Sequence, residues 1–60
     1  MEELINRRVK AIYSDGGREF AIRGELLSVD DLTLSIRGDR DDKVVILGKR
    51  TLVLLREAQK

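Results

Sequence analysis

Lys49 and Arg50 form a basic pair between two apolar runs, and they are the residues of this sequence best suited to binding an anion. Both side chains carry a positive charge and several hydrogen-bond donors, which is what recognition of a phosphate group requires. A basic pair at the tip of a turn is also an ordinary solvated surface feature. The two residues alone leave both interpretations open.

Two acidic clusters offer a different chemistry. Asp30 and Asp31 follow a long apolar stretch, and neighbouring side chains on an extended chain point apart, so they are not a catalytic pair. We interpret them as an Asx-type turn that ends a strand. The alternative is that Asp30 orients a binding loop and caps its N–H groups. The Asp-Arg-Asp-Asp cluster at 39–42 could attract a divalent cation. Its spacing matches no calcium loop, so we predict a polar hairpin turn without a metal.

The sequence lacks the side chains that most enzymes use as nucleophiles and bases. It contains no cysteine and no histidine, so Ser14, Ser28 and Ser35 have no imidazole to activate them. The usual zinc ligands and any disulfide are missing for the same reason. We therefore predict a protein that is not an enzyme and carries no cofactor.

The length of 60 residues predicts a single domain, residues 1–60, with little interior. A chain of this length buries only about 60% of the surface that its unfolded form exposes, so small folds rely on disulfides, metals or oligomerisation. Without cysteine or histidine, oligomerisation is the remedy that remains. The net charge of +1, from twelve basic and eleven acidic residues, means that nucleic-acid binding would depend on where the charges lie rather than on their sum.

No targeting or membrane segment is visible in the sequence. The acidic start Met1-Glu2-Glu3 is not followed by the apolar segment of a signal peptide. No apolar run approaches the roughly 20 residues of a membrane span. We therefore expect a cytoplasmic protein.

The apolar pattern predicts one helical turn and five short antiparallel strands. The helical turn covers residues 2–6, the strands cover residues 9–13, 19–29, 32–37, 43–47 and 51–56, and residues 57–60 are expected to fray. Ser14-Asp15-Gly16-Gly17 predicts a tight hairpin turn, because glycine supplies the positive φ that such turns need. Gly24 predicts a sharp bend or a close backbone approach in the second strand, after which the inward face changes. Phe20, in an apolar strand, is predicted to be a core residue.

These elements indicate an all-β fold: a small, strongly bent five-stranded antiparallel barrel, SH3-like or OB-like in class. The strands at residues 43–47 and 51–56 hardly alternate between apolar and polar residues, although a strand with one face in water should. Apolar edges without proline would be aggregation sites in a monomer. Something must therefore cover these two strands.

Two groups of residues carry a family resemblance. The first group comprises Val9, Ile12, Asp15, Gly16, Phe20, Gly24, Leu26, Val29, Asp30, Leu32, Thr33 and Leu34. The second group is Ile46-Leu47-Gly48 with the apolar strand after it. Over nearly its whole length the chain resembles the Sm-like family of Sm, Lsm and Hfq proteins. The resemblance implies an Sm-like, strongly bent five-stranded sheet. It also implies a homomeric ring of six or seven subunits, in which strand four of one subunit pairs with strand five of the next.

The resemblance further implies binding of single-stranded, often U-rich RNA around the ring pore, as an RNA chaperone or ribonucleoprotein scaffold. The implied contacts come from two segments, the loop after the family aspartate and the turn between strands four and five, which here are Asp30, Asp31, Leu32, Thr33, Gly48, Lys49 and Arg50. Sm and Lsm proteins recognise uracil with an asparagine in the first motif and an arginine in the second, and both differ here. Thr33 or Leu34 stands in the region of the asparagine, and Leu47 stands where the family has the arginine before its motif glycine. We therefore expect RNA binding with low base specificity, through the phosphate contacts of Lys49 and Arg50.

Two other functions remain open on the sequence. A ring that serves as a structural or protein-interaction module, without uridine-specific RNA binding, is favoured by the two replaced side chains. A monomeric SH3-like protein that binds and shapes DNA is disfavoured by the near-zero net charge and the scarcity of aromatic residues. The mass in solution separates the monomer from both rings.

Overall fold

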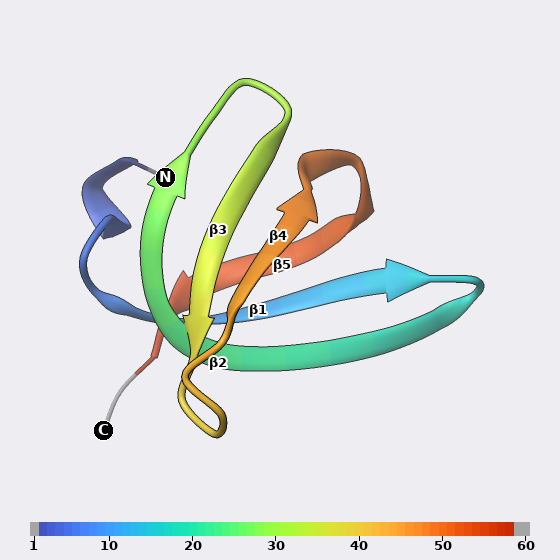
Figure 1. Cartoon of the computed structure of the whole chain (residues 1–60). Helices are drawn as coiled ribbons and strands as arrows, with labels where there is room; N and C mark the ends of the chain where they lie inside the picture. The colour runs from blue at the N-terminus through green and yellow to red at the C-terminus, as the bar shows by residue number, and fades with distance from the viewer. Residues whose placement is uncertain (1, 59–60) are drawn as a thin grey trace.

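The computed structural model describes residues 2–58, and most of them belong to one five-stranded antiparallel sheet (Figure 1). The strands lie side by side in the order β4-β3-β2-β1-β5. The predicted all-β class with five antiparallel strands is confirmed. In chain order the elements, with η for a short 3-10 helix, are η1 (Glu2–Leu4), β1 (Arg8–Asp15), β2 (Arg18–Val29), β3 (Thr33–Gly38), β4 (Val44–Gly48), η2 (Lys49–Thr51) and β5 (Leu52–Glu57).

The hairpin between β1 and β2 turns at Gly16 and Gly17, whose φ angles are 62° and 82°. Two residues in this left-handed conformation match the twist of the strands that they join, and glycine adopts it without strain. The ladder runs up to the pair of Asp15 and Arg18. The predicted turn is confirmed, and β1 extends two residues beyond the predicted end at Tyr13.

The long strand β2 curves strongly and pairs with both β1 and β3 (Figure 1). An ideal Cβ on Gly24 would lie 1.9 Å from the carbonyl oxygen of Arg37, so only glycine fits where the two strands approach. The register with β3 then shifts at Leu27, which has no partner. Because of this shift, Leu26 and Val29 both pack on the core although their parities differ. The predicted close approach at Gly24 and the change of inward face are confirmed.

The core lies between the curved halves of the sheet and is small. Phe20 is not part of it, because it is 41% exposed and stacks on Tyr13 with 5.6 Å between the ring centroids. The prediction that Phe20 is a core residue is wrong: β2 pairs with β3 only from Gly24 onward, so on that side no strand lies beside Phe20. The buried hydrophobic residues are Val9, Ala11, Leu26, Leu34, Ile36 and Leu47.

The strands β4 and β5 form the two edges of the sheet, and no ladder joins them within residues 2–58. The sheet is therefore bent and open rather than closed into a barrel by backbone pairing. On β4 the exposed fraction is 53% for Val44 and 68% for Ile46, and on β5 it is 56% for Val53 and 42% for Leu54. Both apolar strands thus stand at edges, with large apolar side chains in solvent.

The two ends of the described chain are held against β1 and β2. The predicted helical turn is a single 3-10 turn, after which the N–H of Asn6 donates to the carbonyl oxygen of Leu26 at 2.7 Å. At the other end Glu57 belongs to β5, and the N–H of Ala58 donates to the carbonyl oxygen of Arg8 at 2.9 Å. The predicted fraying is therefore wrong for these two residues, and residues 59–60 lie outside the described part. No helix within residues 2–58 is long and apolar enough to cross a membrane.

Candidate functional site

The structure brings the two predicted binding segments, residues 30–33 and 48–50, to the same end of the sheet (Figure 1). β3 begins where its antiparallel neighbour β4 ends, so Thr33 and Gly48 are paired. Beyond this pair the N–H of Lys49 donates to the carbonyl oxygen of Leu32 at 2.8 Å. The predicted site residues are therefore neighbours in space, although 15 or more positions separate most of them along the chain.

Backbone hydrogen bonds shape both segments. The N–H of Asp30 donates to the carbonyl oxygen of Thr33 at 2.8 Å and closes the first turn. β2 ends at Val29, so the predicted end of the second strand before Asp30 is confirmed. Within residues 2–58 the carboxylate of Asp30 accepts no hydrogen bond, so the turn has neither the predicted Asx-type bond nor a capped N–H group. The second turn is η2, where the hydroxyl of Thr51 donates to the carbonyl oxygen of Gly48 at 2.8 Å. The backbone of Lys49 and Arg50 is thus fixed by its neighbours rather than by their own charges.

The side chains at this end of the sheet are mostly acidic. Four carboxylates, from Glu2, Glu3, Asp30 and Asp31, line a hollow of about 310 Å³ together with Val29 and Lys49. The pKa of Glu3 is lowered from its ordinary value, chiefly by a hydrogen bond with the amino-terminal ammonium group, so this carboxyl is ionised at neutral pH. A phosphate would meet more negative than positive charge inside the hollow. Arg50, which is exposed, and Leu32, which is 74% exposed, lie outside its lining.

The acidic turn between β3 and β4 satisfies its own polar groups. Asp39 accepts a hydrogen bond from Arg8, and Asp41 accepts one from the backbone N–H of Lys43 at 3.2 Å. The side chain of Asp42 lies 3.8 Å from the guanidinium of Arg37. Within residues 2–58 no group of three or more acidic, histidine or cysteine side chains could hold a metal ion. These contacts agree with the interpretation of this segment as a polar turn.

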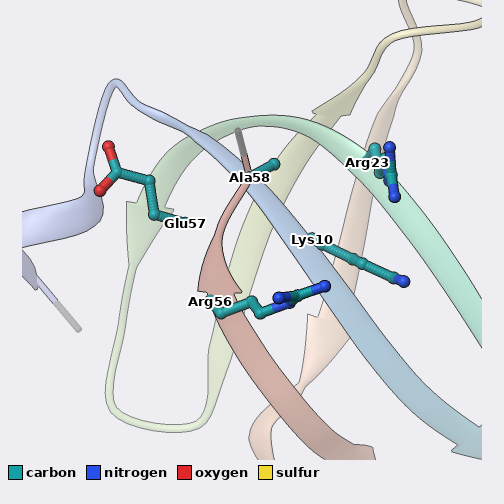
Figure 2. A pocket seen from close by; sticks show the side chains of 5 residues that line it. All are labelled: Lys10, Arg23, Arg56, Glu57 and Ala58. Atoms are coloured by element: carbon teal, nitrogen blue, oxygen red, sulfur yellow. The ribbon is translucent and has the colours of Figure 1, made fainter. Parts of the chain in front are cut away.

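A second group of charges lies on the outer face of the sheet, and sequence reasoning did not bring its three members together. Lys10 of β1 is the register partner of Arg23 on β2 and of Arg56 on β5, so three cations stand in one row across three strands. Figure 2 shows Lys10 and Arg56 extended in the same direction, with Arg23 near them and Glu57 pointing away. We call these three residues the cation row. With Glu57 and Ala58 they line a hollow of about 290 Å³.

Part of the cation row could have been found in the sequence. Once Gly16 and Gly17 form a two-residue turn, Lys10 and Arg23 are equally distant from it and must face each other. Arg56 joins them only through the pairing of β1 with β5, which no local pattern predicts. Comparisons of the chain with protein-family models, curated proteins and solved structures found no match. Its function is therefore inferred from its geometry, its charges and the resemblance of its sequence.

Proposed function

We propose that copies of this chain adopt the Sm-like arrangement, assemble into a closed ring and bind single-stranded RNA as a chaperone or scaffold, without catalysis. The observation that carries the proposal is the position of β4 and β5 at the two edges of one bent sheet. Within residues 2–58 neither edge has a strand on its outer side, and both edges expose large apolar side chains.

The two edges are unlike surfaces, which favours pairing between copies. If β4 of one copy lies beside β5 of the next, the antiparallel sheet continues from subunit to subunit. Contacts between unlike surfaces repeat around a ring when the rotation closes, and they give filaments when it does not. A closed ring leaves no strand edge free, which removes the aggregation hazard of unguarded apolar strands. The six or seven subunits implied by the family resemblance form such a ring.

Assembly would also add to the small core. Val44, Ile46 and Val53 are each more than half exposed in the single chain. Covering each of them is worth roughly 1–2 kcal/mol, given about 1.5–3 kcal/mol for full burial of such a side chain. A domain of this length is expected to have a total stability of only about 3–9 kcal/mol. Edge pairing would therefore supply a large share of the stability of each subunit.

RNA binding is supported by the basic turn at the end of β4. Ring symmetry would repeat Lys49 and Arg50 in every subunit and so multiply a modest local charge. Their side chains offer phosphate contacts, which hold a strand but carry no sequence information. Leu32, beside this turn, is 74% exposed and offers an apolar surface for a base without aromatic stacking. We therefore expect binding to single strands with low base selectivity.

One observation favours a second function, a ring that serves only as a structural or protein-interaction module. In the hollow beside Lys49 the carboxylates of Glu2, Asp30 and Asp31 oppose the approach of phosphates to this part of the predicted site. The ring geometry is the same for both functions, because β4 and β5 are unaffected. The two functions differ only in whether the assembled protein binds RNA.

The ring is tested by the mass in solution, measured by native mass spectrometry or light scattering. We expect a mass several times the 6.8 kDa of one chain. Ile46→Lys places a charge on the exposed face of β4 and should dissociate the ring, whereas Leu32→Lys changes an exposed leucine that belongs to neither edge strand and should leave it intact. A wild-type monomer at micromolar concentration would refute the ring and return the monomeric DNA-binding function to consideration.

RNA binding is tested by fluorescence anisotropy with oligo-U, oligo-A and oligo-C at two salt concentrations. Lys49→Gln combined with Arg50→Gln should weaken binding to all three alike. The matched control combines Arg18→Gln with Lys43→Gln, two exposed cations that form no ion pair within residues 2–58. If the wild-type ring binds none of the oligonucleotides at low salt, the structural module is the function. A strong preference for oligo-U would contradict the expected loss of uracil recognition.

A further inference from the structure

The cation row is an unusual arrangement for the face of a sheet. Like charges that stand directly opposite each other on neighbouring strands repel, and sheets ordinarily place opposite charges there. Here Lys10 has a cationic partner on each side, Arg23 and Arg56. The chain carries almost as many acidic as basic residues, eleven against twelve, so an alternating arrangement was available to it. The row therefore concentrates positive charge that the composition does not require.

Nearby carboxylates do not neutralise the row. Glu57 shares its hollow but points away and is bound to Arg7 at 2.9 Å (Figure 2). Asp39 and Asp41 line a second hollow together with Lys10 and Arg23, but they already accept hydrogen bonds from Arg8 and from the backbone of Lys43. Within residues 2–58 no ion pair or hydrogen bond involves the side chain of any cation of the row. The donors of all three side chains are thus available to a ligand.

The shape of the row indicates what kind of anion it fits. Neighbouring strands lie about 4.8 Å apart, so three cations in register extend over roughly 10 Å. A line of this length presents charge to several phosphates of an extended strand rather than converging on one. Arg56 lies at the opposite end of β5 from Arg50, so the row is separate from the basic turn. A single strand could contact both regions in turn.

We propose that Lys10, Arg23 and Arg56 form a phosphate-binding site, and that its ligand is the sugar-phosphate backbone of single-stranded RNA. The choice of RNA rests on the proposed function, whereas the phosphate chemistry rests on the row alone. The site adds affinity and salt dependence without base selectivity, because phosphates carry no sequence information. It also places RNA on the outer face of β1, away from the carboxylates beside Lys49.

The test compares two variants that each remove one lysine and one arginine charge. The row variant combines Lys10→Gln with Arg56→Gln, and the control combines Arg18→Gln with Lys43→Gln. Glutamine keeps the aliphatic stem, and removing like charges relieves repulsion, so the row variant should melt no lower than wild type in sodium chloride. Anisotropy with oligo-U and oligo-A between 50 and 200 mM salt gives the slope of log K against log salt. Each lost phosphate contact should reduce this slope by about 0.7, so the row variant should lose about 1.4 and the control nothing.

A second measurement separates RNA from free phosphate as the ligand. The melting temperature of each protein is measured in sodium chloride and in inorganic phosphate at equal ionic strength. Phosphate stabilises proteins in general, so the rise in melting temperature of the row variant is subtracted from that of wild type. Phosphate-specific stabilisation of wild type without any RNA binding would overturn RNA as the ligand. If the row variant keeps the salt slope of wild type and the Lys49 and Arg50 variant loses binding, this site is refuted and the proposed function stands. A reduced slope only in the row variant would support this site and contradict the basic turn as the RNA contact.

Discussion

Replacing Gly24 by alanine should remove a large part of the stability of this protein. An ideal Cβ at this position would lie 1.9 Å from the carbonyl oxygen of Arg37 and 2.7 Å from its carbonyl carbon. Non-bonded heavy atoms rest at roughly 3.5 Å, so β2 and β3 would have to separate by about 1 Å or more. The obstacle is backbone, which cannot rotate away as a flexible side chain could.

The expected cost follows from what that separation disturbs. Gly24 pairs with Gly38 and the next residue, Glu25, pairs with Arg37, so the ladder between β2 and β3 weakens at this point. Overpacking costs about 1–3 kcal/mol and a weakened backbone hydrogen bond adds about 1 kcal/mol, which gives about 2–4 kcal/mol in total. Total stability for this length is about 3–9 kcal/mol. A shift of about 4–8 °C per kcal/mol then predicts a melting temperature lowered by about 10 °C or more.

The assay is thermal unfolding followed by circular dichroism, at one protein concentration because assembly makes the melting temperature depend on concentration. The control is Gly48→Ala, since a Cβ on Gly48 meets nothing within 4 Å and its φ of −75° suits any residue. This control should melt within a few degrees of wild type. If Gly24→Ala melts with it, the two strands do not approach as closely as described and the reasoning fails.

Two further substitutions test the backbone and the core by the same assay. Asp42 has a φ of 60°, in the left-handed region that glycine adopts without strain. Asp42→Ala should therefore lower the free energy of unfolding by about 1 kcal/mol, whereas Asp42→Gly should lower it less or not at all. Equal losses in both variants would contradict a strained backbone at this position. Ile36 is fully buried, so Ile36→Ala should cost about 2–5 kcal/mol, and a loss below about 1 kcal/mol would mean that the core is not packed around it.

The features that could be predicted from the sequence depend on local chemistry. Gly16 and Gly17 supply positive φ where the chain reverses, so the first hairpin followed from neighbouring residues alone. Gly24 interrupts an apolar strand where a side chain would otherwise pack, which pointed to a close backbone approach. The strand order places β4 and β5, the two apolar strands that hardly alternate, at the edges of the sheet.

The features that were missed depend on where strands stop covering one another. Phe20 has the parity of a core residue, but its exposure is set by the point where pairing with β3 begins. The pairing of β5 with β1 continues to the pair of Glu57 and Val9, so Ala58 is held by a hydrogen bond to Arg8. The polar residues at the end of the chain did not indicate this pairing. The register between β1 and β5 shifts near Ile12, leaving Val53 without a partner, so the position of Arg56 could not be counted along the chain.

The candidate site also has features that could be predicted from local chemistry and features that could not. Antiparallel pairing of β3 with β4 places residues 30–33 beside residues 48–50, so their proximity followed once the strands were assigned. The acidic surroundings did not follow, because Glu2 and Glu3 reach this end of the sheet only through the packing of η1. Leu4 and Ile5 pack against the core and hold the first turn in place. A short apolar pair at the start of the chain thus changes the charge around Lys49.

The net charge of +1 conceals two regions of opposite sign, and this separation decides where RNA should bind. The hollow beside Lys49 holds four carboxylates, whereas the cation row holds three cations without an acidic partner within residues 2–58. Lys49 lines the acidic hollow, whereas Arg50 lies outside it, so a phosphate that approaches Lys49 also meets the repulsion of these acids. Because exposed charges act over about 8–10 Å at physiological salt, each region affects an approaching strand separately. We therefore expect the loss of Arg56 to weaken RNA binding more than the loss of Lys49, and the single variants Arg56→Gln and Lys49→Gln, titrated with the same oligonucleotide, would show the reverse order if the turn dominates.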